Sequence, residues 1–220
     1  MFTKSNYACK RVKASAIRFL EGKLKLKVNM EKTEARRAVG SSFLGFTFLS
    51  TKKRENGELG YCKPKEKKLK KFENNVREIT SRSKGESFET TIRNLNTYLR
   101  GWMNYYARSS LKGYIKEKAS WIRRRLRQKL WKLWKKGANR KTELRKLGCE
   151  EWKLDKLGKA TSNSYWRMSA RLGMYITNSA LENTFGLIPI EETWNRLHRN
   201  RMMIDKVILS GEKQLVFDFG

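Results

Sequence analysis

The sequence predicts a mainly α-helical protein in which a helical bundle follows a small α/β segment with a β-hairpin. Two patterns predict this class. Before residue 62, several apolar side chains alternate with polar ones or form short runs, which is typical of strands. Beyond Pro64 they recur every three or four residues, which is typical of amphipathic helices. We therefore expect two domains, residues 1–62 and 63–220.

The first domain is predicted to contain one helix and several strands. Residues 1–22 carry apolar side chains at helical spacing after a short lead-in, and residues 24–28 alternate leucine or valine with lysine. Residues 43–49 predict a second strand. Asn56-Gly57 is a strong hairpin-turn signal, which places Tyr61 on the returning strand.

The second domain begins with three predicted helices. Pro64 suits the entry to the first, and residues 81–87 form the loop that follows it. Residues 88–109 predict a central helix, and residues 114–136 a third helix after a break at Gly113. The apolar stripe of the first helix consists of Leu69, Phe72, Val76 and Ile79.

The remaining chain predicts shorter pieces. Residues 137–164 are rich in glycine and lysine, so we expect short helices joined by loops. Residues 181–187 predict a helix that ends at Gly186, and another helix follows Pro189. The apolar alternation of residues 214–220 is compatible with a small strand or a docked extension.

Charge is the strongest signal in the composition. The chain has 51 lysines and arginines against 21 acids, a formal net charge of +30, so its surface repels itself unless a polyanion binds to it. Nucleic acid is the first candidate and a membrane surface the second. The seven tryptophans and eight tyrosines favour nucleic acid or a well-packed core over a charged tail.

The cysteines and the apolar runs indicate the compartment. Three widely separated cysteines, with no Cys-x-x-Cys pair, are typical of free thiols in a reducing environment. No run is apolar enough for a membrane span and no secretory signal is evident. We expect a cytoplasmic protein without a membrane partner.

Residues 98–106 are the first candidate site for RNA. Arginine pairs with phosphate, aromatic rings stack on unpaired bases, and asparagine reads base edges or sugar hydroxyls. The alternative is that part of this segment is core, because a helical apolar stripe runs through Ile92, Leu95, Leu99, Trp102, Met103 and Tyr106. The candidates are Arg100, Trp102, Asn104, Tyr105 and Tyr106.

The helix at residues 114–136 is the second candidate. Its cations are relieved only by Glu117, so like charges repel at helical spacing. The alternative is a solvated helix face. We predict phosphate contacts from Arg123, Arg124, Arg125, Arg127, Lys132 and Lys136. Trp166 and Arg167 open another cluster of aromatic and basic residues.

The inventory of acids and histidines argues against catalysis by this chain alone. Its three aspartates, Asp155, Asp205 and Asp218, are not adjacent, whereas two-metal phosphoryl transfer needs clustered carboxylates. His198 is the single histidine and cannot form a metal site alone. No Walker-type phosphate loop occurs. We therefore predict no catalytic residue, no metal site and no cofactor in this chain.

Several strings resemble a known family, the bacterial group II intron reverse transcriptases/maturases, over the C-terminal part of those proteins. Residues 24–33 resemble the strand and loop after the polymerase active site. Phe43-Leu-Gly-Phe46 resembles the primer-side motif at the end of the palm. Residues 99–106 are similar to the signature of the maturase-specific domain, also called domain X or the thumb. Residues 166–169 and 185–188 resemble the family's C-terminal end.

The resemblance implies binding to group II intron RNA, assistance in its splicing, and a grip on the template–primer duplex. It places Phe43, Leu44, Gly45 and Phe46 beside the primer terminus. The family's Tyr-Ala-Asp-Asp is not supplied here, because Tyr7-Ala8 is followed by Cys9-Lys10.

Two alternatives remain open. One is a subunit of a split RNA-directed DNA polymerase, completed by an N-terminal half that supplies the Mg²⁺ site. The other is a basic RNA-binding protein without specificity, or a decayed fragment.

Overall fold

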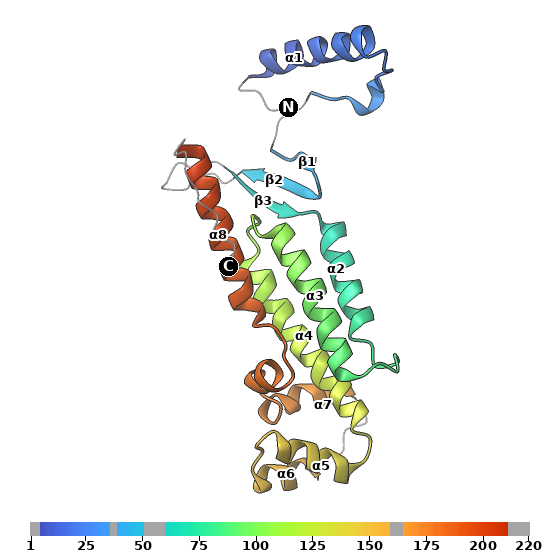
Figure 1. Cartoon of the computed structure of the whole chain (residues 1–220), viewed down its shortest axis with the longest axis vertical. Coiled ribbons are helices and arrows are strands. Elements are labelled where there is room, and N and C mark those ends of the chain that lie inside the picture. The colour runs from blue at the N-terminus through green and yellow to red at the C-terminus, as the bar shows by residue number, and fades with distance from the viewer. Residues whose placement is uncertain (1–4, 36–38, 51–59, 159–164, 211–220) are drawn as a thin grey trace. The chain divides into compact units, whose positions relative to one another are not determined.

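The computed structural model describes residues 5–35, 39–50, 60–158 and 165–210 (Figure 1). The chain divides into two compact units, Met1–Lys65 and Glu66–Gly220. It is mainly helical, with a small three-stranded antiparallel sheet. This confirms the predicted fold class.

The N-terminal unit opens with a helix, as predicted. Helix α1 (Asn6–Arg18) is capped by Ser5, whose Oγ accepts a hydrogen bond of 3.1 Å from the backbone N–H of Ala8. A π-helical turn, η1 (Phe19–Lys23), and a 3₁₀ turn, η2 (Met30–Lys32), follow.

The predicted strand at residues 24–28 is wrong. These residues belong to no sheet, and Leu24 and Leu26 are exposed. Alternation of apolar residues gives a strand only where a neighbouring strand accepts its hydrogen bonds and a core covers its apolar face. Neither is present for this segment among the described residues.

The sheet has the order β1-β2-β3, with each pair antiparallel. Phe43 pairs with Phe46, so Leu44 and Gly45 form a two-residue turn, with φ of 48° and 84°. Such a turn requires positive φ at both positions, which suits glycine. The predicted single strand over residues 43–49 is therefore a hairpin. The strands are β1 (Ser42–Phe43), β2 (Phe46–Ser50) and β3 (Gly60–Pro64).

The return strand is confirmed, because Tyr61 lies on β3 opposite Leu49. The predicted turn at Asn56-Gly57 lies outside the described residues. Pro64 ends β3 instead of opening a helix. It is also the one buried residue among those of this unit whose burial is described, whereas Phe43 and Leu44 of the hairpin turn are exposed.

The C-terminal unit is built from helices. The first three are α2 (Glu66–Ile79), α3 (Phe88–Tyr106) and α4 (Lys112–Leu133). The shorter elements are α5 (Gly137–Lys146), α6 (Glu151–Gly158), α7 (Tyr165–Arg171), η3 (Leu172–Met174) and the π-helical η4 (Ala180–Thr184). The long helix α8 (Ile190–Ser210) follows them.

The helices pack around a shared apolar core. Helix α3 contacts α2 and α8, and α4 contacts α7 and α8, so these helices lie side by side (Figure 1). Leu95 of α3, Leu126 of α4 and Trp194 of α8 are each no more than 1% exposed. The predicted stripe of α2 holds in part, with Phe72 and Val76 buried.

Several predicted boundaries shift. Helix α3 ends at Tyr106, before the predicted residue 109, and α4 starts at Lys112, so Gly113 lies in its first turn instead of breaking the pattern. Ser87 sets the start of α3, because its Oγ accepts a 3.1 Å hydrogen bond from Thr90 N–H. The predicted strand or extension at residues 214–220 lies outside the described residues.

Candidate nucleic-acid interface

The candidates of residues 98–106 divide between two faces of α3. Trp102 is half-buried and Tyr106 is 5% exposed. Their rings pack 4.8 Å apart, and the Trp102 ring lies 4.4 Å from that of Phe72. Burial raises the pKa of Tyr106 above its ordinary value. These two residues therefore belong mainly to an aromatic core.

The other candidates of this segment face solvent. Arg100, Asn104 and Tyr105 are exposed. Arg100 and Asn104 are four residues apart and so share one side of the helix. Core stripe and polar face thus coexist on one helix, as the helical pattern allowed.

Arg123 of α4 is directed into the protein. It is 6% exposed, and its guanidinium forms a bidentate ion pair with Glu191 of α8 and a 3.3 Å contact with Glu182 of η4. Burial opposes the charge, but the two carboxylates together raise the pKa of Arg123. The position differs from the predicted phosphate-facing one, because the two acids neutralise this charge within the fold.

Arg127 is also internal. Its Nε donates to the carbonyl of Ile176 and its Nη2 to Oδ1 of Asn178, each at 2.7 Å. Burial, with the neighbouring Arg123, lowers the pKa of Arg127. The guanidinium holds the segment after α7 against α4, so this residue also differs from the predicted phosphate contact.

Arg124 ties α4 to α7. Its Nε donates to Ser169 Oγ at 3.1 Å and its Nη2 to the carbonyl of Trp166 at 2.9 Å. The guanidinium lies 3.8 Å from the centroid of the Trp166 ring, which is a cation–π distance. Trp166 and Arg167 themselves are exposed. One predicted contact, Arg124, thus orients another, Trp166.

Arg125 ties α4 to α2. Its Nε donates to Thr80 Oγ1 at 2.6 Å and its Nη2 to the carbonyl of Arg77 at 3.0 Å. Burial lowers the pKa of Arg125. Further along the chain, Lys132 and Lys136 are exposed, and Lys132 Nζ donates to the Arg82 carbonyl at 3.1 Å.

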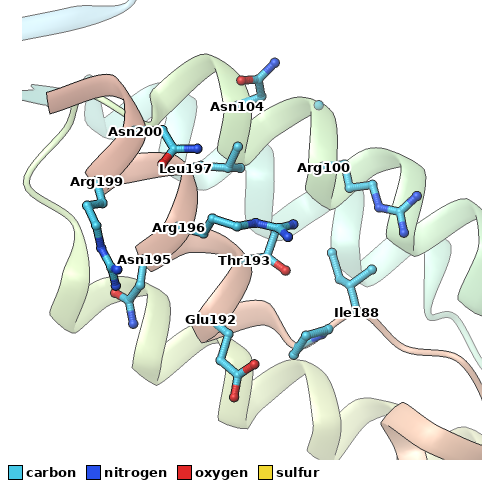
Figure 2. A pocket seen from close by; sticks show the side chains of 12 residues that line it. Arg100, Asn104, Ile188, Glu192, Thr193, Asn195, Arg196, Leu197, Arg199 and Asn200 are labelled. Atoms are coloured by element: carbon cyan, nitrogen blue, oxygen red, sulfur yellow. The ribbon is translucent and has the colours of Figure 1, made fainter. Parts of the chain in front are cut away.

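A groove between α3 and α8 is a further candidate. Its volume is about 950 Å³. Figure 2 shows Arg100 and Asn104 from α3, with residues of α8 along the opposite wall, and the Arg196 side chain runs into the space between the helices. The polar lining consists of three arginines, three asparagines, one threonine and one acid: Arg100, Arg196, Arg199, Asn104, Asn195, Asn200, Thr193 and Glu192.

Two sets of hydrogen bonds hold the groove together. Asn96 of α3 donates to the Gly186 carbonyl at 2.7 Å and accepts from the Ile188 N–H at 3.0 Å, so it fixes the segment that leads into α8. Asn104 accepts a 3.3 Å hydrogen bond from Arg201 of α8. The two walls are therefore linked at two places along α3.

Sequence reasoning found Arg100 and Asn104 but missed the residues of α8. A signal was present, because asparagine and arginine occur as two adjacent pairs, Asn195-Arg196 and Arg199-Asn200. Their spacing of one and four residues places them on adjoining rows of a helix. The apolar residues of the same helix predict a helix, but they do not indicate which helix its polar face lies against.

His198 has a structural place near the groove. Its Nδ1 lies 2.5 Å from the carbonyl of Ala107, the residue after α3, and its ring stacks on Trp194 at 6.0 Å. In the described part of the chain, no three His, Cys, Asp or Glu side chains gather closely enough to hold a metal ion. Within those same residues, no helix has the length and apolar character to cross a membrane.

Comparison with known families identifies part of this unit. Residues 69–148, which run from α2 through α5, match the family model of the group II intron, maturase-specific domain. The match supports a relationship of this chain to group II intron maturases. It covers the maturase-specific domain and not a polymerase catalytic domain. A search of curated proteins found no match.

Proposed function

We propose that this chain is a maturase module of the bacterial cytoplasm that binds structured group II intron RNA and assists its splicing. The observation that carries the proposal is the match of residues 69–148 to the maturase-specific domain. The net charge of +30 supports it, because neutralising RNA phosphates releases counterions and drives binding. The proposed function requires no metal ion or cofactor bound by this chain.

The exposed candidates form the proposed contact surface. Arg100, Asn104 and Tyr105 on α3 are open to solvent, as are Trp166 and Arg167 on α7. Lys132 and Lys136, at the end of α4 and beyond it, are also exposed. Trp102 and Tyr106 pack on the core side of α3 and support this surface, and they do not contact RNA in this proposal.

The test is binding to a group II intron RNA against an unrelated structured RNA of equal length. At about 0.15 M ionic strength, where screening acts over about 8 Å, we expect tighter binding to the intron. The yield of spliced exons should also rise when the chain is added. Equal affinity for both RNAs, with no gain in splicing, would contradict the proposal and leave a basic protein without RNA specificity.

The N-terminal unit favours a second proposal, a subunit of a split reverse transcriptase. Phe19, Leu24, Leu26 and Phe43 are all more than half exposed, and a partner chain would cover them. Such a partner would supply the Mg²⁺ site, and residues 43–46 would lie near the primer. Co-expression with a chain that carries the N-terminal half of a reverse transcriptase should then give primer extension with Mg²⁺ that neither chain gives alone. No gain in extension would exclude it.

A further inference from the structure

The groove between α3 and α8 holds cations that the fold leaves available. Within the described residues, Arg100, Arg196 and Arg199 have no ion-pair or hydrogen-bond partner. Arg123 and Arg127 in the same unit have two or more internal partners each. Three arginines against the single acid Glu192 leave the groove with an excess of positive charge.

Gly101 is a second, independent observation. It lies in the interior of α3 and lines the groove, and a Cβ placed on it would meet nothing within 4 Å. Glycine is less favourable than alanine inside a helix, and here neither close packing nor a positive φ requires it. An open backbone beside three arginines is suited to the close approach of a ligand.

The shape and chemistry of the lining indicate the class of ligand. About 950 Å³ is at the upper end of the range for ligand sites. The side-chain amides of Asn104, Asn195 and Asn200 both donate and accept, so they can pair with base edges or ribose hydroxyls. None of the described residues that line the groove is aromatic, so recognition would depend on hydrogen bonds and phosphate contacts instead of stacking.

We propose that this groove binds an unpaired segment of RNA, with phosphates on the three arginines and bases or ribose hydroxyls on the asparagines. Base edges are accessible to such amides mainly where the strand is unpaired. The proposal rests on the proposed RNA-binding function and names its site. The Asn96 contacts keep the walls in place before RNA arrives, which lowers the entropy cost of binding.

The test fills the groove without disturbing the fold. Gly101→Leu introduces a good helix former into open space, so thermal stability should not fall. Affinity for a fluorescein-labelled single-stranded RNA oligonucleotide should fall about tenfold or more. Gly113→Leu is the matched control, because Gly113 is also exposed, helical and open but does not line the groove. It should bind as the unaltered chain does.

A charge variant gives a second readout. The double substitution Arg196→Gln and Arg199→Gln removes two phosphate contacts. The negative slope of log affinity against log salt should therefore become less steep by about 1.4 for a single strand. The same change for a duplex RNA of equal length should be smaller. An equal loss for duplex and single strand would overturn the assignment to unpaired RNA.

The outcomes separate the two proposals. Suppose that the full chain prefers intron RNA, and that Gly101→Leu binds the intron RNA and the single-stranded oligonucleotide as tightly as the unaltered chain does. The groove proposal is then overturned and the maturase function stands. If the full chain shows no preference for the intron but loses oligonucleotide binding on Gly101→Leu, the groove proposal stands and the maturase function does not.

Discussion

Arg123 and Arg127 on α4 and Arg196 and Arg199 on α8 carry the same guanidinium group in opposite settings. The first pair is at most 9% exposed and is neutralised or hydrogen-bonded by groups from η4, α8 and the segment after α7. The second pair is exposed at the rim of a groove, with no partner in the described structure. The first two arginines therefore hold the fold together, whereas the other two stay available to a ligand.

The difference teaches that density of charge along a sequence does not measure the charge available to a ligand. Helix α4 carries nine lysines and arginines and only one acid, but its arginines serve as links to α2, α7 and α8. A buried guanidinium needs such partners because leaving it unpaired away from water is costly. An exposed guanidinium is solvated by water and can exchange that water for phosphate.

Removing a buried cation should have the largest effect on stability. Arg123→Met leaves Glu182 and Glu191 without their partner, and we expect the free energy of unfolding to fall by about 3 kcal/mol. Urea denaturation followed by circular dichroism measures it. Arg196→Met is the matched control and should change stability by less than about 0.5 kcal/mol. Equal losses would remove the distinction between the two regions.

Breaking the Asn96 contacts should have an intermediate effect on both stability and binding. Asn96→Ala removes one hydrogen bond to the Gly186 carbonyl and leaves the Ile188 N–H without its acceptor, so we expect a loss of about 1–2 kcal/mol. RNA affinity should fall as well, because this contact fixes one wall of the groove. Denaturation and RNA titration of the same preparation test both. Lower stability with unchanged affinity would show that the wall need not be fixed.

The helix that carries one groove wall should depend on its cap. Ser87→Ala removes the hydrogen bond to Thr90 N–H at the start of α3 and should cost about 1 kcal/mol. Ser120→Ala, at an exposed position inside α4, is the control and should be neutral or slightly stabilising. Thermal unfolding of the two variants would show the difference. Similar melting temperatures would mean that the cap contributes little.

A buried lysine should affect how the free energy of unfolding depends on pH, and its removal should cause no large loss of stability. Lys129 of α4 is 1% exposed and donates to Thr91 Oγ1. Burial lowers the pKa of Lys129, an effect that Glu86 opposes and Lys84 reinforces. In the window between its folded pKa and the ordinary lysine value of about 10.4, the unfolded chain holds more protons than the folded one. Stability should therefore rise with pH across that window.

Lys129→Met tests this with a side chain of similar length. The variant should lose the rise in stability with pH and be about as stable as the unaltered protein near neutral pH, or more so. Stability measured by urea denaturation at a series of alkaline pH values checks it. A pH dependence that persists in the variant would assign the effect to another group.

Sequence patterns predicted the helices well where a long amphipathic stripe existed. The spacing of Leu95, Leu99 and Met103 gave the central helix, and all three are buried in it. The alternation of Leu24, Leu26 and Val28 predicted a strand that the structure does not contain. A helix satisfies its own backbone hydrogen bonds, whereas a strand needs a neighbour that the local sequence does not name.

The sequence by itself determined the helical class, the large positive charge, the maturase-like strings and the exposed face that holds Arg100 and Asn104. The tertiary structure alone decided which arginines are neutralised within the fold and which stay available. It brought α8 beside α3, so that Asn104 and Arg201 are hydrogen-bonded although they lie 97 positions apart in the chain. Helical periodicity is a local property, but a groove and a buried ion pair depend on which helix packs against which.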